Sequence, residues 1–127
     1  MFHYTVNTNK TVEQAIVDLT DNLKKEQFGV LWQLDMKEKL HEKDVELDMK
    51  YHILEVCNPS EAQKVLSKNP LVGYFLPCKL AVYEEGGSTK IGMPKPSALI
   101  GLVENEELMK IASDIEQRLI SCIDISR

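Results

Sequence analysis

Two cysteines that flank one predicted helix are the residues of this sequence best suited to chemistry. Cys57 begins a Cys-Asn-Pro run with Asn58 and Pro59, and Cys78 follows Pro77 in a Leu-Pro-Cys run. Cys57 comes just before a helix N-terminus, where free backbone N–H groups and the helix dipole stabilise a thiolate. Because a strand–helix–strand passage can return to the same edge of a sheet, we expect the two runs to form one local site.

Three functions are compatible with these two runs. The favoured interpretation is a ligand-binding or sensing module whose pocket lies near Cys57 and Cys78. The first alternative is a thiol-based redox or sulfur-transfer protein with Cys57 as nucleophile and Cys78 as resolving thiol, which requires Cα atoms within about 7 Å. The second is a structural or interaction module in which both cysteines are core residues, since free cysteine is among the most buried residue types. Cys122 is expected in the core.

The predicted strand at residues 49–57 contributes two further candidates, one on each of its faces. Glu55 shares a face with Cys57, and a buried carboxylate there would have a raised pKa and could exchange protons near neutrality. If that face is open, Glu55 is solvated or lies at a dimer contact. His52 shares the other face with Leu54 and is interpreted as a half-exposed strand histidine in preference to a ligand or a base.

Motifs for metals, nucleotides and nucleophilic catalysis are lacking. The three histidines have no metal-ligand spacing, so the sequence predicts no metal site. Gly86 and Gly87 indicate a hairpin and belong to no phosphate-binding loop. The pattern of a nucleophile elbow is also missing. No catalytic residue and no cofactor can be assigned, and a small-molecule ligand remains the expected partner.

Composition limits the class of protein. The chain has 127 residues, 43% hydrophobic and 28% charged, which is typical of one globular domain over residues 1–127. Its 15 basic and 20 acidic residues give a net charge of −5, so we expect no nucleic-acid partner. The apolar runs are far shorter than the roughly 20 residues of a membrane span. With no signal-peptide pattern and an odd number of cysteines, we expect a cytoplasmic protein without membrane association.

Periodicity predicts alternating strands and helices. The predicted strands cover residues 2–7, 30–35, 49–57, 78–84 and 89–93, and the predicted helices cover residues 12–27, 36–48, 59–68, 97–103 and 106 onwards. This order indicates an α+β fold of two layers, a mixed or antiparallel sheet of about five strands with helices packed on one face. Because the second face stays open, we expect a homodimer that buries it.

Several details of these elements are specific enough to be checked. The first helix is expected to stop at Gly29. Leu40 and Val45 are the expected apolar anchors of the charge-rich segment after the second strand. Val65 and Leu66 are expected to face inward from the helix that Asn-Pro begins.

The two cysteine runs, with the strand Tyr51–Val56 before them and the strand Lys79–Glu84 after them, resemble the DUF302 family over nearly the whole chain. The resemblance implies a compact α+β domain, often a stand-alone bacterial or archaeal protein, and a dimer. It implies no activity and no catalytic residues. Where the family commonly has small residues before the first cysteine, this chain has Glu55 and Val56, which weakens the case for close approach of a ligand to that strand.

Overall fold

The computed structural model describes residues 1–127, which form one five-stranded sheet and a set of helices. The strands are β1 (His3–Thr8), β2 (Gly29–Asp35), β3 (Tyr51–Cys57), β4 (Cys78–Glu85) and β5 (Ser88–Pro94). The α-helices are α1 (Val12–Lys25), α2 (Met36–His41), α3 (Pro59–Lys68), α4 (Pro96–Ile100) and α5 (Glu106–Ser126), and the short 3₁₀ helices are η1 (Pro70–Phe75) and η2 (Gly101–Val103).

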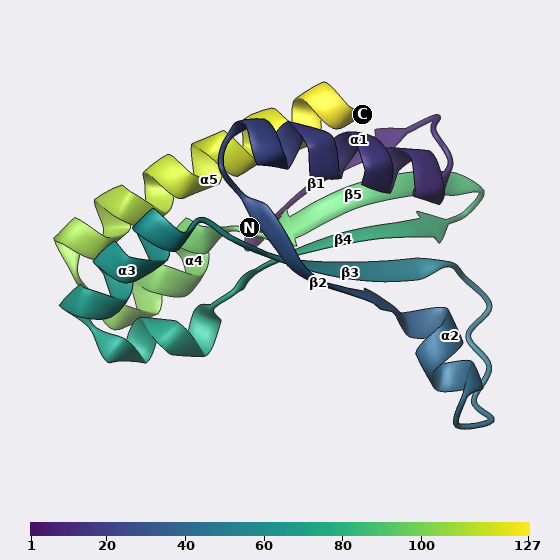
Figure 1. The fold of residues 1–127 in the computed structure, drawn as a ribbon, viewed down its shortest axis with the longest axis horizontal. Coiled ribbons are helices and arrows are strands. Elements are labelled where there is room, and N and C mark those ends of the chain that lie inside the picture. Colours follow the sequence, from purple (N-terminus) through teal and green to yellow (C-terminus); the bar gives the residue numbers. More distant parts are fainter.

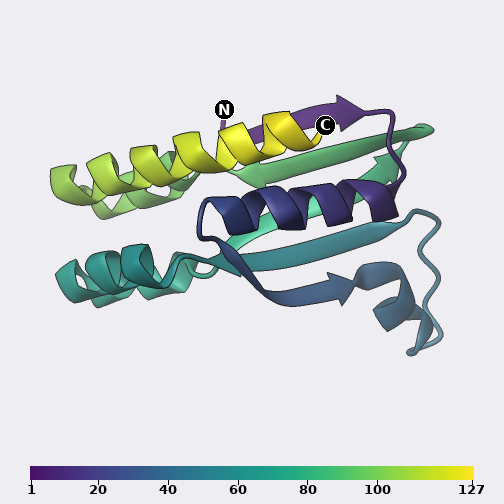
Figure 2. The same ribbon diagram turned by 45° about the horizontal axis from the view of Figure 1, so that its top comes forward.

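The sheet has the strand order β1-β5-β4-β3-β2, and each pair of neighbouring strands is antiparallel. Helices α1 and α5 cover one face of it, whereas the other face carries no helix (Figure 1). Figure 2 shows α3 and α4 beyond one end of the strands and α2 beyond the other. This arrangement confirms the predicted two-layer α+β fold and shows that the sheet is antiparallel. None of the helices combines the length and apolar character that a membrane span requires.

Two hydrophobic clusters hold these layers together. The larger one lies between the sheet and helices α1 and α5, where alternate strand residues such as Leu54 and Leu80 meet Leu19 and Leu119 with essentially no exposed surface. The smaller one joins α3, η1, α4 and the start of α5 beyond the end of the sheet. Its buried residues are Val65, Val72, Ile100, Leu108 and Ala112.

The link between α1 and β2 differs from the sequence-based expectation. The helix ends at Lys25, before the expected stop at Gly29, and Gln27 after it adopts the left-handed conformation with φ 66°. Gly29 is instead the first residue of β2. The register of β2 against β3 then shifts between Val30 and Trp32, so side chains do not alternate regularly between the two faces along this strand. The bulge lets Val30 pack on the core while Trp32 pairs with Glu55 on the opposite face.

Two predicted apolar anchors are also misplaced. Val45 is 50% exposed because α2 ends at His41 and the chain turns away through Asp44, which has a positive φ. Leu66 is 40% exposed, and Val65 alone is buried from α3. The periodicity of these short segments was too brief to define which face is covered. The helix η1 was not predicted at all.

Asn58 is the predicted cap of α3, and it is buried. Its Oδ1 accepts a hydrogen bond of 3.2 Å from the Glu61 N–H, and Pro59 occupies the first helical position. We expect Asn58→Ala to lower the free energy of unfolding by about 1 kcal/mol, because the amide of Glu61 loses its acceptor. Urea denaturation measures this loss. The matched variant Asn58→Asp keeps the acceptor and should retain most of the stability; equal stability of the alanine variant and the wild type would contradict this role.

Candidate functional site

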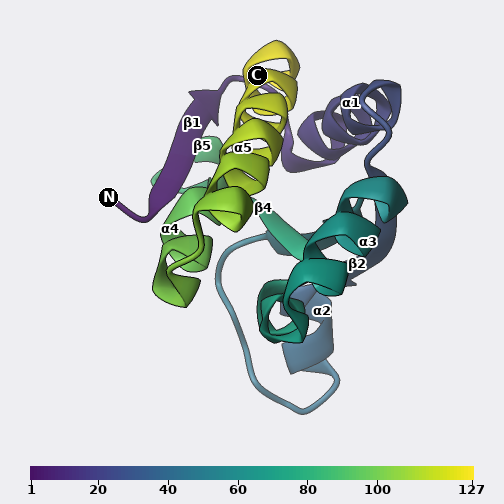
Figure 3. The ribbon, with the colours of Figure 1, turned by 90° about the vertical axis from the view of Figure 1, so that its left-hand side faces the viewer.

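A cavity of about 270 Å³ lies where the sheet meets the helices at its α3–α4 end. Viewed from this end, β4 emerges between α3 on one side and α4 with the start of α5 on the other (Figure 3). Seventeen residues from β3, β4, β5, η1, α3, α4, α5 and the segments beside them line the cavity, and twelve of these residues are hydrophobic. Glu55 and Lys79 are the charged residues among them. The space is therefore an apolar pocket with charge confined to one pair of side chains.

The cavity exists because β4 and β5 separate. Strand β4 pairs with β3 from Cys78 onwards, but its pairing with β5 extends only as far as Ala81 opposite Gly92. Beyond Gly92 the last residues of β5 continue to pair with β1, and Lys95 donates its backbone N–H to Phe2 at 2.6 Å. Pro94 has no N–H to donate to a neighbouring strand. The end of β5 thus stays with β1, and a gap opens beside the start of β4.

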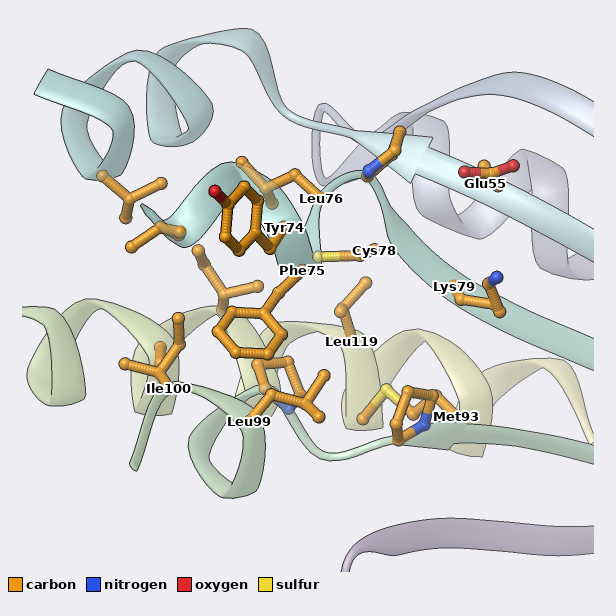
Figure 4. Close-up of a pocket in the computed structure, with 17 residues that line it drawn as sticks. Glu55, Tyr74, Phe75, Leu76, Cys78, Lys79, Met93, Leu99, Ile100 and Leu119 are labelled. Atoms are coloured by element: carbon orange, nitrogen blue, oxygen red, sulfur yellow. The ribbon is translucent and has the colours of Figure 1, made fainter. Parts of the chain in front are cut away.

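The helical walls of the cavity are apolar and firmly held. Phe75 comes from η1, Leu99 from α4 and Leu119 from α5, and Figure 4 shows their side chains gathered around one space. Helix α4 has no cap from its own N-cap residue. Instead Glu116 of α5, itself buried, accepts hydrogen bonds from the Ser97 N–H at 3.0 Å and the Ser97 hydroxyl at 2.6 Å.

Glu116 is a residue that sequence reasoning missed. Its place on the buried side of α5, between Ala112 and Leu119, is the signal that could have revealed it, because a carboxylate in an apolar stripe requires a partner. The contact fixes α4 against α5 and so fixes one wall of the cavity.

Cys78 lines the cavity, as does the preceding Pro77, whose peptide bond with Leu76 is cis. Burial raises the pKa of the Cys78 thiol to about 11, and the nearby Cys57 adds to this increase. The thiol is therefore protonated at neutral pH. It presents the cavity with a weakly polar, uncharged S–H group.

Cys57 lies at the same end of the sheet as Cys78, but its side chain is on the opposite face. Val56 is the cross-strand partner of Cys78, whereas Cys57 is paired with Gly29 on the other side of β3. Since side chains alternate between faces along a strand, Cys57 and Cys78 face opposite sides of the sheet. Cys57 does not line the cavity. The two cysteine runs are thus adjacent, as expected, but their thiols are directed apart.

Three other predicted residues, Asn58, Pro59 and His52, also do not line the cavity. Asn58 and Pro59 form the start of α3 and do not line the cavity. His52 lies toward the opposite end of β3, where Nδ1 is 3.4 Å from the Gln33 amide and Nε2 is 3.8 Å from the Asp35 carboxylate. It belongs to a separate polar groove near α2. No group of three or more His, Cys, Asp or Glu residues is placed to hold a metal ion.

Glu55 does line the cavity, and it does so next to Lys79. The two residues are direct partners across the β3–β4 ladder, on the face of the sheet that carries no helix. Glu55 is half-buried and Lys79 is exposed. The gap between β4 and β5 therefore connects the apolar space under the helices with a charged pair on the open face.

Comparison with known proteins finds a matching family and a solved structure with the same fold. A family model described as "Domain of unknown function DUF302" matches residues 4–125. The crystal structure of an uncharacterised conserved DUF302 protein from Bacillus stearothermophilus has a TM-score of 0.97 and 54% sequence identity, covering 100% of this chain and 99% of that one. The chain matches no curated protein.

The raised pKa of Cys78 predicts a dependence of stability on pH. The thiol titrates near 9.0 in the unfolded chain and at about 11 in the folded chain. Between these values the unfolded state has lost a proton that the folded state keeps, so stability falls as pH rises from about 9 to 11, by at most about 2 to 3 kcal/mol. Chemical denaturation at several pH values measures the decrease. The other titratable groups affect stability equally in the wild type and in Cys78→Ala, so the variant should show a smaller decrease over this pH range. Identical pH profiles of stability for the two proteins would contradict the prediction.

Proposed function

Since the chain belongs to the DUF302 family, whose description assigns no activity, we propose a function from its cavity: the domain is a binding or sensing module for a small, largely apolar molecule. The ligand occupies the gap between β4 and β5, beside Cys78. We further propose that the domain works in the cytoplasm, where its three free cysteines stay reduced.

The single observation that supports this function is a partly open apolar pocket at the end of the sheet. The apolar side chains that line an open space forfeit dispersion contacts that they would make in a close-packed interior. A volume of about 270 Å³ is close to the lower end, roughly 300 Å³, of the range for pockets that bind drug-sized ligands. An occupant of smaller size would restore those contacts and remove its own apolar surface from water. The neutral thiol of Cys78 is compatible with such an occupant.

The redox or sulfur-transfer alternative has less support. Cys57 and Cys78 face opposite sides of the sheet, and the raised pKa keeps Cys78 in its unreactive thiol form at neutral pH. Both features are unfavourable for a nucleophile and its resolving partner.

Ligand binding can be tested by thermal unfolding with neutral apolar molecules such as indole, phenol and hexan-1-ol. A molecule at 100 times its Kd stabilises the folded state by about 2.7 kcal/mol, so the wild type should show a raised Tm. Leu99→Trp fills the cavity and should abolish the increase. The matched control Leu102→Trp changes a residue of η2 that is 75% exposed and outside the cavity lining, and it should behave like the wild type.

Chemical-shift mapping on the wild type provides a second readout that does not depend on the folding of the tryptophan variants. The amide signals of Phe75, Cys78 and Leu119 should shift on titration. If no molecule of this kind raises the Tm, or if the increase persists in Leu99→Trp, the proposed function is wrong.

We also propose that two copies associate through the sheet face that carries no helix. Trp32 is 56% exposed there, and Tyr51 and Tyr83 stack with ring centroids 4.8 Å apart. The charges on this face cancel although the chain carries −5: they are Glu55, Lys79, Glu85 and Lys90. A second copy would therefore meet aromatic surface without the repulsion expected from the rest of the molecule.

Sedimentation velocity tests this association. The wild type should sediment as a species of twice the 14.5 kDa of the chain. Trp32→Glu places a charge on the exposed aromatic surface of the contact and should give a monomer with an unchanged circular dichroism spectrum. Leu102→Glu, a similar change at a distant exposed position, should leave the dimer intact. A monomeric wild type, or equal behaviour of the two variants, would exclude this interface.

A further inference from the structure

Glu55 and Lys79 form a charged mouth of the cavity, and from these two residues we infer the class of ligand. We propose that the ligand is a free α-amino acid with an apolar side chain: the side chain fills the cavity, the carboxylate binds Lys79 and the ammonium group binds Glu55. This inference rests on the proposed function and specifies the ligand of the same site.

The position of the two charges supports a ligand with one polar end. Glu55 and Lys79 are partners in the β3–β4 ladder, so their Cβ atoms are separated by roughly 5 Å. Figure 4 shows them along the strands, on one side of the cavity, whereas Phe75 and Leu99 lie on the other. A molecule that crosses the gap between β4 and β5 would therefore have its apolar part among the helices and its polar part on the open face.

The lack of ion-pair partners for Glu55 and Lys79 indicates which polar group of a ligand fits between them. Elsewhere on the sheet, Lys90 forms an ion pair with Glu85 at 3.2 Å, and Lys50 contacts Glu84 at 3.8 Å. Glu55 and Lys79 form no such ion pair with each other or with another residue, although they are directly opposite each other. Each retains its hydrogen-bonding capacity for a ligand.

Ligands with a single charge fit this mouth less well. An isolated carboxylate would bind Lys79 but lie beside the negative charge of Glu55, and an isolated ammonium would meet the converse repulsion from Lys79. A neutral polar group can hydrogen-bond to either residue but gains no attraction between opposite charges. A zwitterion presents both signs within a few ångströms and satisfies both residues with charge-assisted hydrogen bonds.

The size of the cavity restricts the rest of the molecule. Its volume of about 270 Å³ exceeds that of a single apolar side chain but is too small for a long acyl chain or a large cofactor. Leucine and phenylalanine therefore fit better than lipids. The uncharged Cys78 thiol and the apolar rings around it disfavour a charged or strongly polar side chain.

Calorimetric titration of the full chain with a matched series of ligands tests the proposal. The series is L-leucine, 4-methylpentanoate with the carboxylate only, 3-methylbutylamine with the ammonium only, and 4-methylpentan-1-ol with neither. We expect leucine to bind at least tenfold more tightly than each of the other three. L-phenylalanine should bind in the same range as leucine.

Variants of the two charged residues identify the groups that they recognise. Lys79→Met should weaken leucine about tenfold and leave 3-methylbutylamine no weaker, and Glu55→Gln should weaken leucine and leave 4-methylpentanoate no weaker. The double exchange Glu55→Lys with Lys79→Glu restores both charges and should recover part of the affinity. The matched control Lys24→Met removes an exposed charge on α1, away from the cavity lining and from the open sheet face, and should bind leucine like the wild type.

The results separate this inference from the proposed function. If 4-methylpentan-1-ol binds in the cavity but leucine binds no more tightly, the zwitterionic ligand is wrong while the apolar binding site stands. Equal leucine affinity of the wild type, Lys79→Met and Glu55→Gln would also overturn the inference. If no member of the series binds, the proposed function itself fails.

Discussion

The separation of β4 from β5 is the constraint on which the rest of this account depends. The other three strand pairs extend to this end of the sheet, β2–β3 with a bulge, but β4 and β5 stop pairing after Ala81 and Gly92. Pro94 lacks a donor and the following backbone amide bonds to the residue before β1, so β5 cannot close onto β4. An antiparallel sheet that paired fully here would leave no path between its two faces. The gap supplies that path and places Cys78 beside it.

The helices at the end of the sheet convert the gap into a partly enclosed pocket. Their small hydrophobic cluster is separate from the main core, and α4 depends on Glu116 of α5 for the hydrogen bonds that its own N-cap does not provide. A buried carboxyl oxygen that accepts from an amide and a hydroxyl resists displacement, because separating α4 from α5 would leave that oxygen without a hydrogen-bond donor. The wall therefore keeps its position, and the cavity remains a defined space.

The sequence predicted the elements of this fold better than their mutual contacts. Long periodic segments identified most helices and strands, and the Asn58–Pro59 pair identified the start of α3. The bulge near Leu31 and the turn at Gln27 have no strong local signature, so residue spacing alone does not define the faces of β2. Of the residues proposed for the site, Pro77, Cys78 and Glu55 line the cavity. The opposite orientation of Cys57 depends on the register between β3 and β4, which residue spacing alone does not provide.

The most direct test of the central claim, that this gap forms an apolar binding cavity, is a crystal structure of the protein under xenon pressure. Xenon enters apolar cavities without needing polar partners. The account predicts xenon density between Phe75, Leu119 and the Cys78 thiol, with the surrounding side chains unmoved. A structure in which these side chains fill the space themselves, with no xenon beside Cys78, would contradict it.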